Sequence, residues 1–173
     1  MNTDWRVVDR ELRCIARSRA ALDAKEAKWL RDAERLCIWR HLGHPSMLAY
    51  MESTLGHGPQ AARERLRMAR ALESLPKVED ALHEGGLSYS ATREITRVAT
   101  PKTEGKWLDA ALGKNLREVE EMVAGRAPGD EPGDLPRPDL RSRGVHFELL
   151  PDAFALWRET QKVLEDRVRA SSG

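Results

Sequence analysis

The chain has 173 residues, with 29 Lys and Arg against 28 Asp and Glu, so its formal net charge is +1. Hydrophobic residues make up 40% and charged residues 33%. This composition is too apolar for a wholly disordered chain and too polar for a membrane protein. The length is typical of about one domain of ~100–200 residues. The near-neutral balance excludes a strongly basic nucleic-acid-binding domain, so DNA binding would require a local basic patch.

The positive charge is concentrated in the N-terminal part of the chain. Residues 1–75 contain 14 basic and 10 acidic side chains, and most of the basic ones are arginines. Residues 76–125 contain 7 basic and 9 acidic side chains, and residues 126–173 contain 8 and 9. The planar guanidinium of arginine suits phosphates and base edges. If the chain binds nucleic acid, the basic patch is therefore expected mainly within the first 75 residues, and the alternative is that arginine-rich helices are a general feature of the proteome's composition.

The two cysteines, Cys14 and Cys37, do not form a Cys-x-x-Cys pair, so they indicate neither a zinc site nor a redox motif. Both lie among helically spaced apolar residues and are expected in the core. No run approaches the roughly 20 apolar residues of a membrane span. The N-terminus lacks the basic and apolar regions of a signal peptide. We therefore expect a cytoplasmic protein that does not bind a membrane.

The first 75 residues predict three or four helices. Residues 4–42 contain neither Gly nor Pro, and their apolar residues recur at helical spacing. This pattern predicts one long helix, or two with a break near Asp23. Ser46 is expected to cap a short helix that runs through Leu55. After a glycine-rich turn, a further helix is expected over residues 60–75.

Four shorter helices are expected next, over residues 77–84, 89–99, 101–112 and 116–124. Ser88 is expected to cap the second of them. Thr100 followed by Pro101 predicts a cap with proline at the first helical position. Asn115, with Glu118 three residues later, resembles a capping box that opens the fourth helix.

The composition changes after residue 125. Residues 126–144 contain four of the nine prolines, which predicts an extended linker or arm. Residues 145–150 alternate like a half-buried strand, and a last helix is expected over residues 153–169. A lone strand cannot satisfy its own backbone groups, so we expect it to pair with a partner chain or with sequence beyond Gly173.

These elements predict a mainly α-helical fold. Residues 1–125 are expected to form a multi-helix bundle that contains a helix-turn-helix over residues 46–75. A Pro/Gly-rich linker over residues 126–144 and a strand plus helix over residues 145–173 follow it, the latter as the possible start of a truncated segment.

The sharpest pattern is the helix, glycine-containing turn and arginine-rich helix over residues 46–75. In a helix-turn-helix, the first helix braces the second in the major groove. On a wheel of about 100° per residue, Ala62, Leu66 and Ala69 share one arc, and Arg65 lies near it, where a carboxylate partner is expected. The predicted DNA contacts are Gln60, Arg63, Arg67 and Arg70 on this helix, with Ser88, Tyr89, Arg93 and Arg97 on a secondary surface. The alternative is a helical bundle whose exposed face is basic.

No catalytic residue and no metal ligand is assigned. The chain contains no P-loop, dinucleotide fingerprint or nucleophile elbow. His41 and His44 have metal-like spacing, but Gly43 and Pro45 break the helix there and no third ligand is near. The tryptophans at helical spacing are expected in the core, and they are Trp29, Trp39, Trp107 and Trp157.

Several motifs resemble a known family. They are Leu55-Gly56, Leu75-Pro76, Gly86-Leu87-Ser88, residues 93–104, Trp107 and residues 117–120. Together they resemble the N-terminal region of bacterial HNH endonuclease proteins, labelled domain of unknown function 222, over nearly the whole chain. The same order of short motifs is more distantly similar to the helix-turn-helix domain of ParB-type partition proteins. The start of the recognition helix departs from that pattern, since it reads Gly58-Pro59-Gln60, so no sequence preference is implied.

The resemblance implies a DNA-binding module that targets an HNH nuclease to double-stranded DNA. The HNH motif of that family lies C-terminal to this region, and it needs a His general base and further His or Asn ligands to a divalent cation. The five histidines of this chain do not form such a motif. No nuclease activity and no cofactor are therefore expected from this chain alone, and a divalent metal would belong to a missing HNH domain.

Two further interpretations stay open. The first is a helical dimerisation or protein-interaction module without nucleic-acid binding. It would form a homodimer through the N-terminal helices or the strand over residues 145–150. It is compatible with DNA binding, because helix-turn-helix proteins often dimerise. The second is a nuclease fragment whose catalytic part has been lost.

Overall fold

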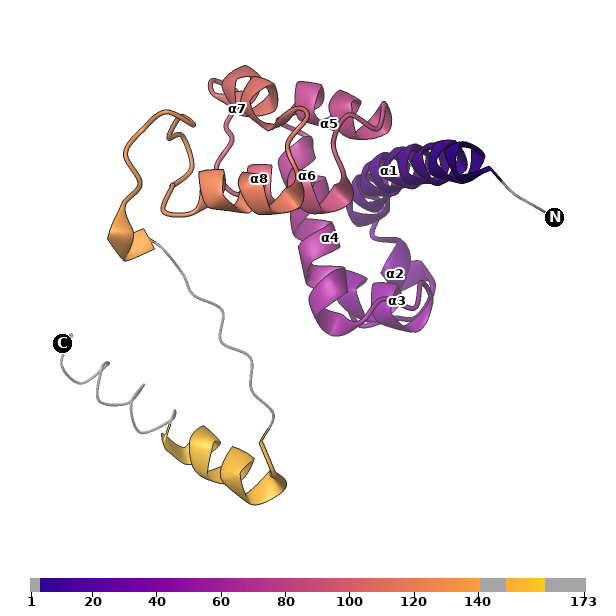
Figure 1. The fold of residues 1–173 in the computed structure, drawn as a ribbon. Coiled ribbons are helices and arrows are strands. Elements are labelled where there is room, and N and C mark those ends of the chain that lie inside the picture. Colours follow the sequence, from indigo (N-terminus) through magenta and orange to yellow (C-terminus); the bar gives the residue numbers. More distant parts are fainter. Residues whose placement is uncertain (1–3, 141–148, 161–173) are drawn as a thin grey trace. The chain divides into compact units, whose positions relative to one another are not determined.

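The computed structural model describes residues 4–140 and 149–160. The chain divides into two units, Met1–Ser142 and Arg143–Gly173, which are considered separately. The mainly helical fold is confirmed, and the described residues contain no strand. In order, the helices are α1 (Trp5–Arg35), α2 (Ile38–His41), α3 (Met47–Ser53), α4 (Pro59–Leu72), α5 (Pro76–His83), α6 (Tyr89–Ile95), α7 (Glu104–Ala111), α8 (Leu116–Val123) and the 3-10 helix η1 (Pro138–Leu140) (Figure 1).

Helix α1 is one continuous helix of 31 residues. The side chain of Asp4 caps it by accepting a hydrogen bond from the backbone N–H of Arg6. This confirms the first of the two alternatives, one long helix without a break near Asp23, where the chain has no helix-breaking residue and Asp23 pairs with Arg65. The helix ends at Arg35, and Cys37 then takes a left-handed conformation with φ 51°, which turns the chain into α2.

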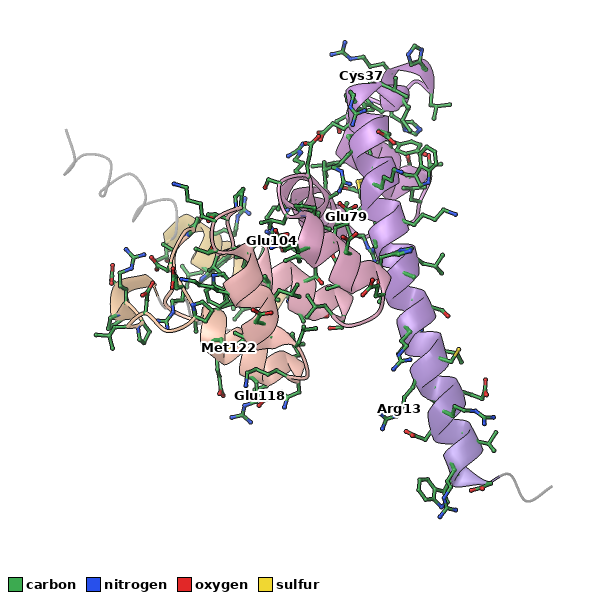
Figure 2. All side chains as sticks on the ribbon, turned by 90° about the horizontal axis from the view of Figure 1, so that it is seen from above. Arg13, Cys37, Glu79, Glu104, Glu118 and Met122 are labelled. Atoms are coloured by element: carbon green, nitrogen blue, oxygen red, sulfur yellow. The ribbon has the colours of Figure 1, made fainter. Side chains whose placement is uncertain are left out.

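Only the second half of α1 packs into the body of the first unit. Its small and apolar residues Ala20, Ala24, Ala27 and Leu30 are buried, and α1 contacts α4 and α5. Residues 5–19, which we call the arm, are all exposed. Figure 2 shows this part of α1, around Arg13, extending past the other helices.

The turn after α5 marks the base of the arm. Gly85 has a φ of +75° there, and a Cβ atom at this position would lie 2.8 Å from Cγ of Arg17. Glycine is therefore required at this site both by the left-handed backbone and by the close approach of α1.

Helices α3 and α4 form around the predicted turn. The Ser46 side chain accepts from the N–H of Ala49, which confirms the predicted cap of α3. Gly56 provides a left-handed residue, with φ +72°, and Pro59 opens α4. The predicted apolar arc of α4 is buried, together with Met68 and Leu72. α4 is a central helix, since it contacts α1, α3, α5 and α6.

The caps of α6 and α8 agree with the sequence. Ser88 accepts from the N–H of Ala91, and Asn115 and Glu118 form the capping box of α8. The predicted start of α7 is wrong. Thr100-Pro101 opens a turn instead, and the helix begins at Glu104. The hydroxyl of Thr103 closes this turn by accepting from the N–H of Thr100.

The core confirms some apolar predictions and corrects others. Trp107 is fully buried and donates from Nε1 to the backbone oxygen of Asp130 over 2.8 Å, and Trp39 packs against the core. Cys14 is exposed and Cys37 is half-buried, so neither is a core residue. Trp29 is also exposed. Cys14 lies in the first part of α1, where all residues are exposed, and Trp29 lines an open groove rather than the core.

The proline-rich segment after residue 125 is not an extended linker over its described part. The N–H of Gly129 donates to the oxygen of Val98 over 2.9 Å, and the N–H of Arg137 donates to Gly125 over 2.8 Å. The carboxylate of Asp130 accepts from the N–H of Ala127. This segment therefore covers Trp107 and belongs to the first unit.

In the second unit, residues 151–160 are helical. Phe154 and Trp157 stack with ring centroids 5.9 Å apart, and both are exposed, whereas Trp157 was expected in the core. The predicted strand over residues 145–150 lies largely outside the described residues, as does the end of the last helix. Among the helices that are described, none has the length and apolar character to cross a membrane.

Candidate interaction surfaces on α1 and α4

The predicted DNA face of α4 is both exposed and free of ion pairs with described residues only near the start of the helix. Gln60 and Arg63 are exposed there. Arg63 makes no ion pair with a described residue, and it lines an open groove of about 490 Å³ between α2, α3 and α4 together with Arg40 and Arg70. This groove is the part of the predicted face that a phosphate can reach.

Arg67 points into the body of the first unit rather than away from it. Its guanidinium donates to the backbone oxygen of Arg93 over 2.9 Å and pairs with Glu64 at 3.2 Å. It also reaches Thr96 Oγ1 at 3.4 Å. Arg67 thus ties α4 to the end of α6.

Arg70 is exposed but occupied. Its Nε donates to Oε2 of Glu34 over 2.9 Å, and a second bond joins Nη2 to Oε1 of the same carboxylate. The hydrogen bond from Arg70 lowers the pKa of the Glu34 carboxyl, against partial burial, which raises it. This bidentate pair connects α4 to α1, and because Glu34 balances the charge of Arg70, the pair has no net charge to attract a phosphate.

The predicted secondary surface has structural roles within the unit. Ser88 caps α6. Arg93 pairs with Glu94 at 2.7 Å, and Arg97 lies 3.5 Å from both Glu64 and Glu94. Partial burial raises the pKa of Glu64, but the charges of the neighbouring arginines lower it further than burial raises it.

Arg65 forms the most connected ion pair of α4. It pairs with Asp23 at 2.9 Å and with Glu26, as expected from its place on the wheel. Its guanidinium also lies 4.6 Å from the ring centroid of Tyr89, and burial raises the pKa of the Tyr89 hydroxyl. Tyr89 is therefore packed over an arginine, and His57 joins the same cluster through Glu26 at 2.9 Å.

The arginines of the arm differ from those of α4. Arg6, Arg10, Arg13 and Arg17 recur at helical spacing along one side of α1. The first three form ion pairs only with neighbouring carboxylates on the same exposed helix or at its cap, and their side chains are 71–75% exposed. Such pairs are worth about 0–1 kcal/mol, so they compete weakly with another anion.

A second side of α1 carries large apolar residues that the described chain leaves uncovered. Every seventh residue from Val8 to Leu36 is apolar, and Trp5 and Leu12 form a second pair at the same spacing on the arm. This apolar stripe consists of Trp5, Val8, Leu12, Ile15, Leu22, Trp29 and Leu36, which are between 43 and 67% exposed. A sustained seven-residue spacing is typical of a helix that pairs with another helix.

The two halves of the stripe have different surroundings. Along the arm, no other described helix lies beside the stripe. From Leu22 onward it forms one wall of an apolar groove of about 580 Å³, whose other wall contains Ile38, Tyr50 and Leu55. Contiguous exposed apolar surface of this kind marks interaction sites on soluble proteins.

Of the two histidines at metal-like spacing, His41 and His44, the second has a structural role. His44 lies between Ser53 and Thr54, with its ring nitrogens 3.2 and 3.3 Å from their hydroxyls, and it contacts Tyr50 edge-on. It therefore tethers the end of α3. Among the described residues, no three His, Cys, Asp or Glu side chains converge as metal ligands.

No protein-family model matches the chain, and no curated protein or solved structure is significantly similar to it. The site is therefore interpreted from its own geometry. The sequence indicated the N-terminal helices as a dimer interface but not which of their apolar residues are exposed, although the seven-residue spacing from Val8 to Leu36 is visible in it.

Proposed function

We propose that the chain is a protein-interaction module that associates with another helix through the apolar stripe of α1. The observation that carries this proposal is the exposure of that stripe on a helix whose opposite side is either packed or basic. Large apolar residues at seven-residue spacing bury little against their own chain here, so their burial is left for a partner. This was the alternative interpretation of the sequence.

The ion pairs of α4 and α6 favour helix association over DNA binding as the main function. Arg67, Arg70, Arg93 and Arg97 all bind carboxylates within the unit. To contact DNA they would have to give up partners that are partly buried, which costs free energy. The apolar stripe needs no such rearrangement.

The thiol footprint of the arm tests the proposal. The substitution Leu12→Cys places a thiol on the stripe, two residues from the native Cys14, which is exposed and lies off the stripe. Trypsin cleaves after Arg13, so mass spectrometry can quantify the alkylation of each thiol separately. In the purified chain, or in extracts of the cells that make it, we expect the introduced thiol to react several-fold more slowly than Cys14.

After denaturation in urea the two thiols should react at similar rates, which controls for intrinsic reactivity. Equal rates in both native samples would reject the proposed function, because nothing would then cover the stripe.

DNA binding is a second candidate function, and one observation favours it. Arg40 and Arg63 line the same groove and make no ion pair with a described residue. The exposed arginines of the arm add positive charge. If the resemblance to the HNH endonuclease region is correct, this role would be the targeting of a nuclease to DNA.

Anisotropy of a fluorescent duplex at low salt tests the second candidate. Phosphate contacts release counterions, so the logarithm of the affinity should fall linearly with the logarithm of the salt concentration. The absence of any anisotropy change at micromolar protein would reject it.

A further inference from the structure

We infer that the partner of the apolar stripe is a second copy of this chain, paired antiparallel so that the arm of each copy lies along the apolar groove of the other. The inference rests on the proposed function and names its partner. It is carried by the fit between the two halves of α1, by the charged residues within the stripe and by the position of the helical bodies.

The arm and the groove match in length and in kind. From Trp5 to Arg19 and from Leu22 to Leu36, the helix rises by about 21 Å in each case. The arm is a helix with an uncovered apolar side, and the groove is an apolar trough between α1 and residues of α2, α3 and the turn after α3. The arm of one copy can therefore fill the groove of the other copy, and the groove can cover the apolar side of the arm.

An antiparallel pair centred between Arg19 and Leu22 brings these halves together twice. Leu12 of each copy lies opposite Trp29 of the other, and Trp5 lies opposite Leu36. Such an arrangement is isologous: the same patch is used on both copies, related by a two-fold axis, and the assembly closes as a dimer.

The charged residues within the stripe oppose the parallel alternative. The seven-residue pattern of Trp5 and Leu12 continues through Arg19 and Glu26. A parallel pair in register places Arg19 against Arg19 and Glu26 against Glu26, and like charges facing each other are unfavourable. In the antiparallel register, Arg19 faces Leu22 and lies about one helical turn from Glu26 of the other copy.

The position of the body adds a steric argument. In each copy, α1 packs against α4 and α5 only through its second half. A parallel pair brings two bodies to the same end of the helices and leaves both arms paired only with each other. An antiparallel pair separates the bodies and gives each groove a helix.

Cysteine cross-linking tests the register in the full chain. We would prepare Leu12→Cys and Trp29→Cys separately, each in a background with Cys14→Ser and Cys37→Asn. Asn is chosen at position 37 because it tolerates the left-handed backbone there. Both test positions are exposed and outside the core, so the substitutions should leave the fold intact.

Under oxidation, we expect each variant alone to remain uncross-linked and the mixture of the two to form a disulfide-linked dimer on a non-reducing gel. Cross-linking of each variant with itself would indicate a parallel pair and overturn the inference. The absence of cross-linking in all three samples would overturn the register.

Light scattering of the native chain separates this inference from the proposed function. We expect a dimer at about 100 µM that Leu12→Glu disrupts, whereas Cys14→Glu, which adds the same charge off the stripe, leaves it intact. A monomer throughout would overturn the inference. Protection of the Leu12→Cys thiol in cell extract alone would then preserve the proposed function with a different partner.

Discussion

Helices α1 and α4 are both arginine-rich and amphipathic, yet the structure uses them in opposite ways. The arginines of α4 are mostly bound to carboxylates of α1 or of α4 itself, and its apolar arc is buried. Along the arm of α1, both the arginines and the apolar residues are exposed. The difference shows that a helical wheel identifies the sides of a helix but not which of them the rest of the chain covers.

The largest expected effect contrasts a buried tryptophan with an exposed one. Trp107→Ala removes a fully buried side chain and its bond to Asp130, and should lower the free energy of unfolding by about 3–5 kcal/mol. Trp29→Ala, on the stripe, should cost less than about 1 kcal/mol in dilute monomer. Urea denaturation followed by circular dichroism at low micromolar concentration measures both. Equal costs would show that Trp29 is packed within its own chain.

A smaller contrast concerns two arginines of α1 itself. Arg31 donates to the oxygen of Ala69 and to both oxygens of Glu79. Arg31→Ala leaves that carboxylate partly buried without its partner, so we expect a loss of about 2–4 kcal/mol in unfolding free energy. Arg13→Ala breaks only an exposed pair with Asp9 and should cost less than about 0.5 kcal/mol. The same denaturation experiment measures both variants. A larger loss of unfolding free energy for Arg13→Ala than for Arg31→Ala would contradict the contrast between the packed and the exposed half of α1.

DNA affinity provides a third contrast, provided that the duplex binds. The double substitution Arg40→Ala with Arg63→Ala removes two groove arginines that form no ion pair with a described carboxylate. It should weaken binding several-fold and lower the salt-dependence slope by about 2. Arg67→Ala should leave the slope unchanged, because that guanidinium is already bound to Glu64 and Arg93. Anisotropy titrations at several salt concentrations measure the slopes, and a larger change for Arg67→Ala would place the DNA face elsewhere.

The smallest effect expected is a pH dependence of the link between α1 and α4. Arg70 lowers the pKa of Glu34 below its usual value near 4.5. The stabilisation by the Arg70–Glu34 pair is therefore present above the pKa of Glu34 in the unfolded chain. It is lost as the pH falls through the lower pKa of Glu34 in the folded chain. Arg70→Gln should reduce the drop in melting temperature between neutral pH and the acidic side of the Glu34 titration. Arg10→Gln, whose pair is exposed, is the matched control, and an equal change in both variants would contradict the role of this pair.

Local chemistry is what the sequence predicted best. The caps at Ser46, Ser88 and Asn115 depend on a side chain and the next few backbone groups, so their pattern is legible in a short window. The carboxylate partner of Arg65 followed from its place beside the apolar arc. The start of α7 was missed because Thr103 closes a turn after Pro101 that competes with a helix start.

The candidate site depended on longer-range packing. Whether Arg67 faces a ligand or α6 is decided by contacts between helices far apart in the sequence. Likewise, Trp29 and Leu30 are neighbours on α1, but one is exposed and the other buried. Periodicity cannot distinguish these cases, because α1 has two apolar sides and the body covers one of them.

The glycine at the base of the arm has a mechanical consequence. Gly85 lies against Arg17, so a larger residue at position 85 would push α1 away from the turn after α5. We take the packed part of α1 near Ala27 as the point about which the helix would then pivot. Along the helix, Arg17 is about 15 Å from that pivot point and Trp5 is about 33 Å from it. A side chain at position 85 that displaced α1 by about 1 Å would therefore move the tip of the arm by about 2 Å. The direction of the first turns of α1 therefore depends on Gly85, a residue without a side chain that is far away in the sequence.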